Sequence, residues 1–201
     1  MENSGTVYTS DHRFRIILGS KSPRRQELIR GLGLDFEIRT LETPEDYPET
    51  LDPRKVPEFL ARLKSDALVD TLAPDELLIT SDTIVLLENE IIGKPDDAAD
   101  AVKMLRKLSG KPHEVITGVC LKSLGYEKSF SVTTKVFFNE LSDEAIAYYV
   151  ENYKPFDKAG AYGIQEWIGY VAISRIEGSH FNVMGLPVAE LWQELRLADK
   201  L

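Results

Sequence analysis

The chain has 201 residues, which is enough for one compact domain with its own core. It contains 24 Lys and Arg against 33 Asp and Glu, so its formal net charge is −9 at pH 7. This charge disfavours binding to nucleic acid polymers and anionic membranes, because the long-range field of the protein repels phosphate backbones. The single cysteine, Cys120, excludes an intrachain disulfide and a cysteine-rich zinc site, and its apolar surroundings indicate a core residue.

The N-terminal sequence has no recognisable targeting segment. Residues 1–12 lack the basic and apolar regions of a secretory signal, and no apolar run is long enough to cross a bilayer. We therefore expect a cytoplasmic protein with a loose extension over residues 1–12 and a single domain over residues 13–201. Residues 85–140 are a candidate second lobe within that domain.

Strand and helix patterns alternate along the first two-thirds of the chain, which predicts an α/β fold. The strand at 77–87 is apolar on both faces, so we place it in the middle of the sheet. Residues 40–55 and 153–169 are expected to be loops. In chain order we expect a strand at 14–18, helices at 23–32 and 56–71, strands at 77–87 and 90–92, a helix at 96–108, strands at 114–124 and 129–139, a helix at 142–152, a hairpin of strands at 170–176 and 181–184, and a helix at 187–198.

Residues 20–25 (SKSPRR) form a candidate anion site at a predicted strand-to-helix junction. Ser20 and Ser22 lie beside the free backbone N–H groups of a helix start, which bind anions. The helix dipole contributes only about 0.3–1 kcal/mol, so Arg24 and Arg25 would provide most of the affinity for a phosphate. The alternative is an ordinary helix capped by Ser22 with exposed arginines, although basic residues in a first turn oppose the dipole.

Asp82 interrupts the apolar strand at 77–87. A carboxylate in such a strand is costly unless it is paired or binds a metal. At the mouth of the sheet it would serve as a metal ligand or a base. A structural aspartate, bonded to Ser81, Thr83 or the backbone, explains the pattern equally well.

Five further polar residues are candidates, each with a plainer alternative. Lys64 lies within a predicted helix and Lys94 in a Gly-Lys-Pro bend, and each alone fits a solvated surface lysine. Glu45 belongs to an acidic loop. The loop 157–165 (DKAGAYGIQ) has small residues that allow a ligand to approach the backbone, with Lys158 and Gln165 as polar contacts, or it is an ordinary glycine-rich loop.

Familiar signatures of other site classes are missing from the sequence. The three histidines have no metal-ligand spacing, and we expect His113 to be structural or at the surface unless it supports a neighbouring site. Neither a Gly-x-Gly-x-x-Gly fingerprint nor a Walker-type loop is present, so dinucleotide and ATPase functions are disfavoured.

Six motifs follow one another along nearly the whole chain. They are Ser20-x-Ser22-Pro23-Arg24-Arg25, residues 81–85 (SDTIV), 93–95 (GKP), 105–118 (through Ser109-Gly110 to Thr117-Gly118), 157–165 (DKAGAYGIQ) and 185–187 (GLP). Taken together, they resemble the motifs of Maf proteins, which occur in the same order. The resemblance implies a nucleoside triphosphate pyrophosphatase that cleaves between the α and β phosphates with a divalent cation, Mg²⁺ or Mn²⁺. It also implies an α/β fold with a long mixed sheet and flanking helices, similar to inosine triphosphate pyrophosphatases, with two lobes around a cleft.

The loop at 157–165 resembles the family branch that acts on dTTP and UTP, and modified pyrimidine nucleotides are further candidate substrates. The branch that acts on 7-methyl-GTP differs in this loop and is one alternative. A non-catalytic nucleotide-binding regulator of septum formation is another. Lys21, the pair Glu166-Trp167 and Met184 depart from the residues usual in the family.

The resemblance implies that Asp82 is the proton acceptor and that Arg24, Thr83 and Gln165 influence substrate choice. Our hypothesis adds that Glu45 and Asp82 hold the cation. The expected oligomer is a homodimer. The residues expected to bind the triphosphate substrate are Ser20, Ser22, Arg24, Arg25, Lys64, Thr83, Lys94, Lys158 and Gln165.

Overall fold

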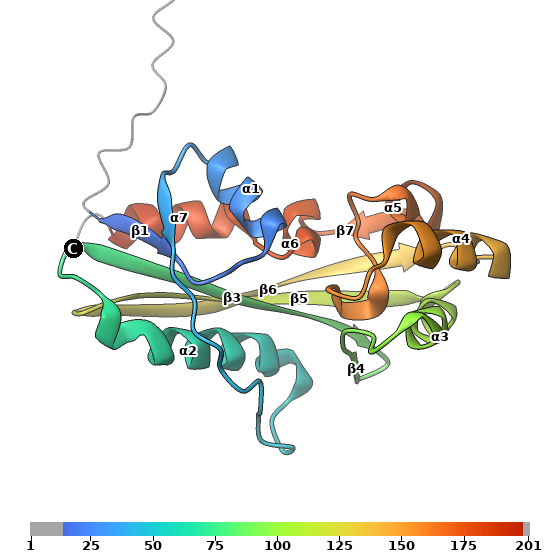
Figure 1. The fold of residues 1–201 in the computed structure, drawn as a ribbon, viewed down its shortest axis with the longest axis horizontal. Coiled ribbons are helices and arrows are strands. Elements are labelled where there is room, and N and C mark those ends of the chain that lie inside the picture. Colours follow the sequence, from blue (N-terminus) through green and yellow to red (C-terminus); the bar gives the residue numbers. More distant parts are fainter. Residues whose placement is uncertain (1–13, 199–201) are drawn as a thin grey trace, which may run out of the picture.

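Strand β3 (Glu76–Leu87) lies inside a mixed sheet and is buried along most of its length. The computed structural model describes residues 14–198, and Figure 1 shows helices on both faces of the sheet. Among these residues the sheet has seven strands, in the order β2-β1-β3-β5-β6-β7 with β4 paired to β3. The expected α/β fold with a mixed sheet and flanking helices is confirmed.

The strands of the sheet run in both directions. β1 runs parallel to β2 and β3, whereas the remaining strand pairs are antiparallel. No helix in the described range is long and apolar enough to cross a membrane. The strands are β1 (Arg15–Leu18), β2 (Phe36–Ile38), β4 (Glu90–Ile92), β5 (Pro112–Ser123), β6 (Tyr126–Phe138) and β7 (Ile173–Glu177); the helices are α1 (Pro23–Gly31), α2 (Val56–Leu68), α3 (Ala98–Leu108), α4 (Asp143–Tyr153), α5 (Trp167–Ala172), α6 (His180–Met184) and α7 (Val188–Ala198).

Successive residues of β3 face opposite layers of the fold, because side chains alternate along a strand. Val85 belongs to the large core that includes side chains of α1, α3 and α7. Ile84 packs instead in a separate core with Leu60 of α2. Figure 1 shows α1 and α7 on one side of the sheet and α2 on the other. Asp82 therefore faces the layer of α2, and Thr83 faces the layer of α1.

One edge of β3 has no strand partner at residues 80–84. β1 pairs with β3 only as far as Ile79, and β4 pairs with it from Val85 onward, so no described strand fills the interval. The loop after β1 bends in here, and Gly19 N donates to the Ile79 carbonyl at 2.8 Å. A Cβ on Gly19 would lie 2.6 Å from Thr80 Cγ2, so this approach needs a glycine. The break in pairing leaves room for side chains to reach the backbone of β3.

Of the two strands predicted near the C-terminus, the one at 181–184 is wrong and the one at 170–176 is only partly right. Residues 181–184 belong to helix α6, because Ser179 Oγ caps its start by accepting from Asn182 N at 3.3 Å, and Gly185 ends it at φ 113°. The first part of the strand predicted at 170–176 lies in helix α5, and β7 is the only strand there among the described residues. The short β2 is not among the predicted elements, because three residues are too few for an alternating pattern.

The predicted domain boundaries are left open by the structure. The loose extension predicted over residues 1–12 lies outside the described residues. β3 passes residue 85 without a break, and the division into two lobes stays a prediction.

Gly118 of β5 lies directly against the backbone of α2. An added Cβ would lie 2.2 Å from Glu58 N and 2.3 Å from Pro57 C, and backbone atoms cannot turn aside. We expect Gly118→Ala to lower the free energy of unfolding by at least about 2 kcal/mol, measured by urea denaturation. Gly125→Ala is the matched control, because nothing lies within 4 Å of its added Cβ. Similar losses in both variants would contradict the packing argument.

Candidate active site

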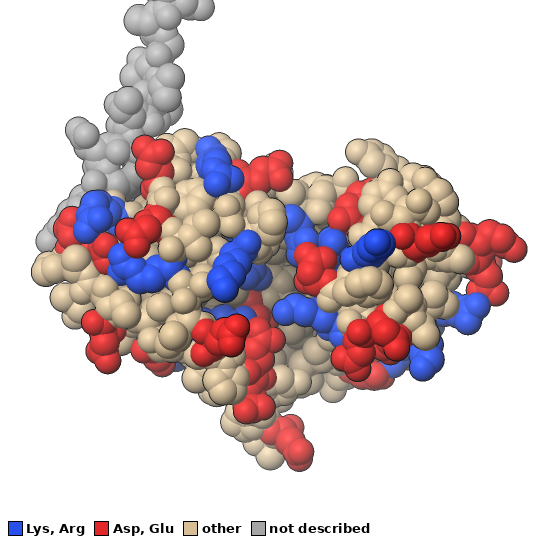
Figure 2. All heavy atoms as spheres, viewed as in Figure 1, with Lys and Arg blue, Asp and Glu red and all other residues tan. Residues whose placement is uncertain are grey.

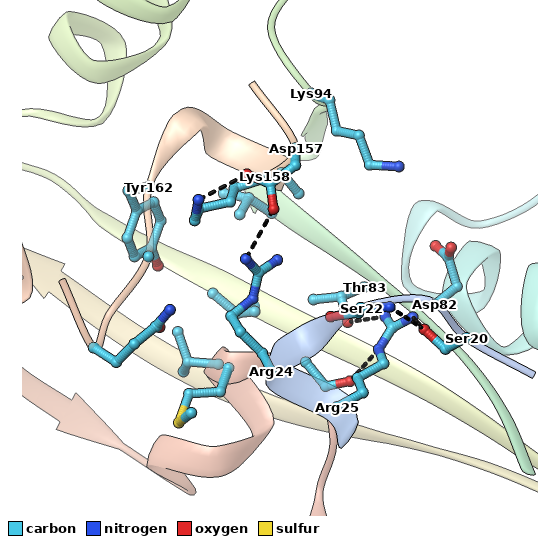
Figure 3. A pocket seen from close by; sticks show the side chains of 18 of the residues that line it. Ser20, Ser22, Arg24, Arg25, Asp82, Thr83, Lys94, Asp157, Lys158 and Tyr162 are labelled. Carbon is cyan, nitrogen blue, oxygen red and sulfur yellow. Dashed lines mark hydrogen bonds and ion pairs between the residues drawn. The ribbon is translucent and has the colours of Figure 1, made fainter. Parts of the chain in front are cut away.

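A cavity of about 250 Å³ opens beside the unpaired edge of β3. Figure 2 shows basic side chains around a hollow near the middle of this face, and Figure 3 shows the side chains that line it. Glu45 lies in an adjoining depression, which shares Lys64 and Lys94 with the cavity. Every other predicted site residue lines the cavity itself, namely Ser20, Ser22, Arg24, Arg25, Lys64, Asp82, Thr83, Lys94, Lys158 and Gln165.

The side chains of Arg24 and Arg25, at the start of α1, make different contacts. The guanidinium of Arg25 enters the unpaired interval of β3, where Nη1 donates to the Ser81 carbonyl at 2.9 Å. Its Nε donates to the Gly185 carbonyl at 2.8 Å and its Nη2 to Thr83 Oγ1 at 3.1 Å. Burial lowers the pKa of Arg25, and nearby Asp82 opposes that shift. Because most of its donors are engaged by the protein, Arg25 joins three segments around the cavity.

A chain of hydroxyl groups continues from Arg25 across the sheet. Thr83 Oγ1 lies 2.9 Å from Thr117 Oγ1, its direct neighbour on β5, and Thr117 donates to the Asn182 carbonyl at 3.0 Å. Asn182 is fully buried and anchors α6 by donating to the Val115 carbonyl at 3.1 Å. Thr117 and Asn182 are absent from the predicted site, because only the register of β3 with β5 reveals Thr117 and only the position of α6 reveals Asn182.

The loop before α1 presents two serines to the cavity. Ser20 Oγ accepts from Ser22 N at 3.2 Å. Ser22 occupies the N-cap position of α1 as expected, but its side chain makes no capping hydrogen bond. Its hydroxyl is therefore not committed to the helix.

Asp82 and Glu45 meet at one ammonium group. Lys64 Nζ lies 2.5 Å from Asp82 Oδ1 and 2.8 Å from Glu45 Oε1. Partial burial raises the pKa of Glu45, but the hydrogen bond and charge of Lys64, with the charge of Lys94, outweigh it, so the pKa lies below its ordinary value. The alternation of β3 explains this geometry, because it directs Asp82 toward α2.

These two carboxylates could also hold a divalent cation. Within residues 14–198, no group of three or more His, Cys, Asp or Glu could hold a metal ion by itself. Mg²⁺ commonly uses one or two protein carboxylates and takes its other ligands from substrate phosphates and water. Glu45 and Asp82 fit that pattern, because both reach the same point beside the cavity.

A second charged group lines the opposite wall. Arg24 Nη1 lies 3.0 Å from Asp157 Oδ2, and Lys158 Nζ lies 2.7 Å from Asp157 Oδ1 (Figure 3). Partial burial raises the pKa of Asp157, but its two cationic partners, Lys158 and Arg24, lower it by more. The pKa of Asp157 therefore lies below its ordinary value. Asp157 is not among the predicted site residues, although it begins the loop motif at 157–165.

The lining of the cavity also has an apolar part beside Gln165. Gln165 Oε1 is buried and has no hydrogen-bond partner in the structure. A buried amide oxygen without a donor is costly, which points to a donor supplied by a ligand. The apolar lining residues are Val85, Val115, Ala159, Val183 and Met184, with the ring of Tyr162.

His113 supports that wall from within the core. It is 2% exposed, and its Nε2 lies 2.8 Å from the hydroxyl of Tyr162. Burial lowers the pKa of His113 to about 4, so the imidazole is neutral at pH 7. This buried position excludes the surface role and matches a structural role beside the cavity.

Comparison with known proteins places these features in a family. The family Maf, described as Maf-like protein, matches residues 15–198, and the chain belongs to it. The chain is 55% identical over 185 residues to a protein of Phocaeicola vulgatus named dTTP/UTP pyrophosphatase, which covers 92% of this chain and 96% of that protein. A Porphyromonas gingivalis protein of the same name is 52% identical over 187 residues, covering 92% and 94%.

Solved structures give a more distant comparison. The Ham1 protein of Staphylococcus aureus aligns over 90% of this chain and 99% of that chain, with 20% identity and a TM-score of 0.49. At that level the likeness adds nothing to the fold described above from the sheet itself.

The contrast between the two arginines is testable by stability. Arg25→Met leaves the Ser81 and Gly185 carbonyls without their donors, so we expect the free energy of unfolding to fall by about 3 kcal/mol. Arg24→Met removes a partly exposed ion pair with Asp157 and should cost less than about 1 kcal/mol. Urea denaturation of both variants measures the difference. Equal losses would mean that Arg25 does not join the segments around the cavity.

Because His113 is buried, we expect the free energy of unfolding to depend on pH. The unfolded chain binds a proton near pH 6.5, whereas the folded chain binds it only near pH 4. This contribution to stability is therefore present above pH 6.5 and is lost as the pH falls toward 4. Between pH 7.5 and 5 we expect the loss from this residue to be about 2 kcal/mol. His113→Gln should lose that much less over the same interval, and an identical pH dependence in both proteins would contradict the assignment.

Proposed function

We propose that this protein is a nucleoside triphosphate pyrophosphatase that hydrolyses dTTP and UTP to the nucleoside monophosphate and pyrophosphate. Modified pyrimidine nucleotides are further candidate substrates. The observation that carries the proposal is one cavity in which Arg24, Lys64, Lys94 and Lys158 surround Asp82. The relatives named dTTP/UTP pyrophosphatase, which match almost the whole chain, support it.

The charges of the cavity suit a triphosphate. A nucleoside triphosphate carries about four negative charges, and catalysis of phosphoryl transfer consists largely of positioning and neutralising them. In the structure each of these cations except Lys94 has a carboxylate partner, so the phosphates would take over contacts now made by Asp157 and Glu45. The Arg24 guanidinium has a forked geometry that matches phosphate oxygens.

The reaction needs a water molecule that attacks phosphorus and a group that accepts its proton. We assign the proton to the carboxylate of Asp82, whose orientation is fixed by Lys64 at 2.5 Å. A new P–O bond forms to the water oxygen as the bond of the α–β anhydride breaks, and the cations stabilise the charge on the departing pyrophosphate. A divalent cation, Mg²⁺ or Mn²⁺, held by Glu45 and Asp82 would supply further charge neutralisation.

The free oxygen of Gln165 favours a pyrimidine base. Thymine and uracil each present an N3–H donor between two carbonyl oxygens. A side-chain amide can accept a hydrogen bond from N3–H and donate one to a neighbouring carbonyl oxygen. Gln165 Oε1 lacks a partner in the structure, so such a base would satisfy it. The alternative of a 7-methyl-GTP pyrophosphatase is disfavoured by the sequence of the loop at 157–165, because the loop of that branch differs.

Asp82→Asn tests the reaction. The amide keeps the shape of the side chain but cannot take up the proton, so we expect pyrophosphate release from dTTP to fall at least about a hundredfold. The assay uses the purified full chain with Mg²⁺ or Mn²⁺ and measures pyrophosphate. Asp143→Asn is the control. Asp143 lies at the start of α4, forms an exposed ion pair with Arg106 and does not line the cavity. Release by Asp82→Asn near the wild-type rate would overturn the mechanism.

A substrate screen over normal and modified triphosphates tests the choice of nucleotide. Preferred release from dTTP and UTP is expected, whereas preferred release from 7-methyl-GTP would move the protein to the other branch. Release from none of them would favour a non-catalytic nucleotide-binding regulator. A cytoplasmic location and a homodimer stay predictions from the sequence.

A further inference from the structure

Glu166 is a partly buried carboxylate next to the cavity that the mechanism above does not use. It precedes helix α5, and its side chain is 19% exposed. Its Oε1 lies 3.1 Å from Lys158 Nζ, and its Oε2 accepts a hydrogen bond from the hydroxyl of Tyr149. Because Glu166 does not line the cavity, it has no direct route to a substrate there.

The backbone around Glu166 is shaped to receive its carboxylate. A Cβ on Gly163 would lie 2.9 Å from Glu166 Cδ and 3.0 Å from its Oε2, so the carboxylate occupies the place of a side chain at residue 163. The hydroxyl of Tyr149 also accepts from Gly163 N at 3.0 Å. Burial and the neighbouring carboxylate of Glu166 raise the pKa of Tyr149, which keeps this hydroxyl protonated. Glu166 therefore contacts both Tyr149 of α4 and the loop at Gly163.

Lys158 has two acidic partners that differ in exposure. Its own side chain is 9% exposed, and its ammonium contacts both Asp157 and Glu166. Asp157 is 59% exposed and shares its carboxylate with Arg24, so a phosphate can compete with it for both cations. Glu166 lies behind the lining and stays in contact whichever anion occupies the cavity. A buried ammonium without such a partner would be costly.

We propose that Glu166 is a positioning residue that holds the ammonium of Lys158 at the wall of the cavity. It acts through Lys158 and touches no reacting atom. The charged and titratable groups around this ammonium are Asp157, Glu166, Arg24 through Asp157, and Tyr149 through Glu166. The consequence for turnover rests on the proposed function, whereas the effect on Lys158 does not.

The first test measures Lys158 directly and needs no activity. Trace acetic anhydride labels uncharged amines, and mass spectrometry of the peptide that contains Lys158 gives its labelling rate against pH. In Glu166→Gln the ammonium loses one partner, so we expect its labelling rate at pH 8 to rise several-fold to about tenfold. Glu177→Gln is the matched control, because Glu177 pairs with Arg175 on the exposed strand β7. An unchanged Lys158 profile in folded Glu166→Gln overturns the proposal.

Glu166→Asp covers the case in which the amide variant does not fold. It keeps the charge but shortens the side chain, so labelling should rise by less than in a neutral variant while KM for dTTP rises. A wild-type labelling profile together with a wild-type KM in this variant would also overturn the proposal.

The second test asks whether Glu166 acts through Lys158. Glu166→Gln should raise KM for dTTP by about tenfold with little change in kcat, because a binding contact is misplaced. In a Lys158→Met background the same change should have no further effect, since the group that it positions is gone. Additive effects would assign Glu166 a purely structural role. If the wild-type protein hydrolyses no nucleotide, the proposed function fails, and the labelling experiment still decides the role of Glu166.

Discussion

The site depends on the interval of β3 where one edge of the strand, opposite β5, has no strand beside it. Buried backbone carbonyls need donors, and a guanidinium brought under cover needs acceptors, so the Ser81 carbonyl and Arg25 satisfy one another. Around this contact the alternation of the strand sends Asp82 toward α2 and Thr83 toward α1. The cavity is therefore built from both layers of the fold, although its centre lies on a single strand.

Electrostatic balance is local in this protein. The chain is acidic as a whole, yet basic groups gather at one cavity, and three of them are neutralised there by carboxylates. Binding a polyanion is then an exchange of partners, in which phosphate oxygens replace Asp157 or Glu45 and the carboxylates return to water. The affinity is the difference between two sets of ion pairs, so it depends on the carboxylates that the ligand displaces as well as on the residues in contact with the ligand.

The sequence predicts most of the sheet, because the long apolar strands and the turns between them leave clear periodic patterns. It cannot separate Arg24 from Arg25, since neighbouring helical residues differ in direction and only the fold shows that one meets Asp157 and the other the backbone of β3. Thr117 is likewise visible only through strand register. The run at 181–184 is apolar enough to suggest a strand, and its helical form follows from Ser179 and Gly185 at its ends.

Gly118 has a consequence for chemistry as well as for packing. It stands opposite Asp82 in the register of β3 with β5, and the backbone of α2 rests against it. Lys64 belongs to that same helix, so the separation between helix and sheet also sets how far its ammonium stands from the carboxylate of Asp82. The absence of a Cβ at Gly118 thus controls the spacing of the charged groups of Lys64 and Asp82, although neither residue lies on β5.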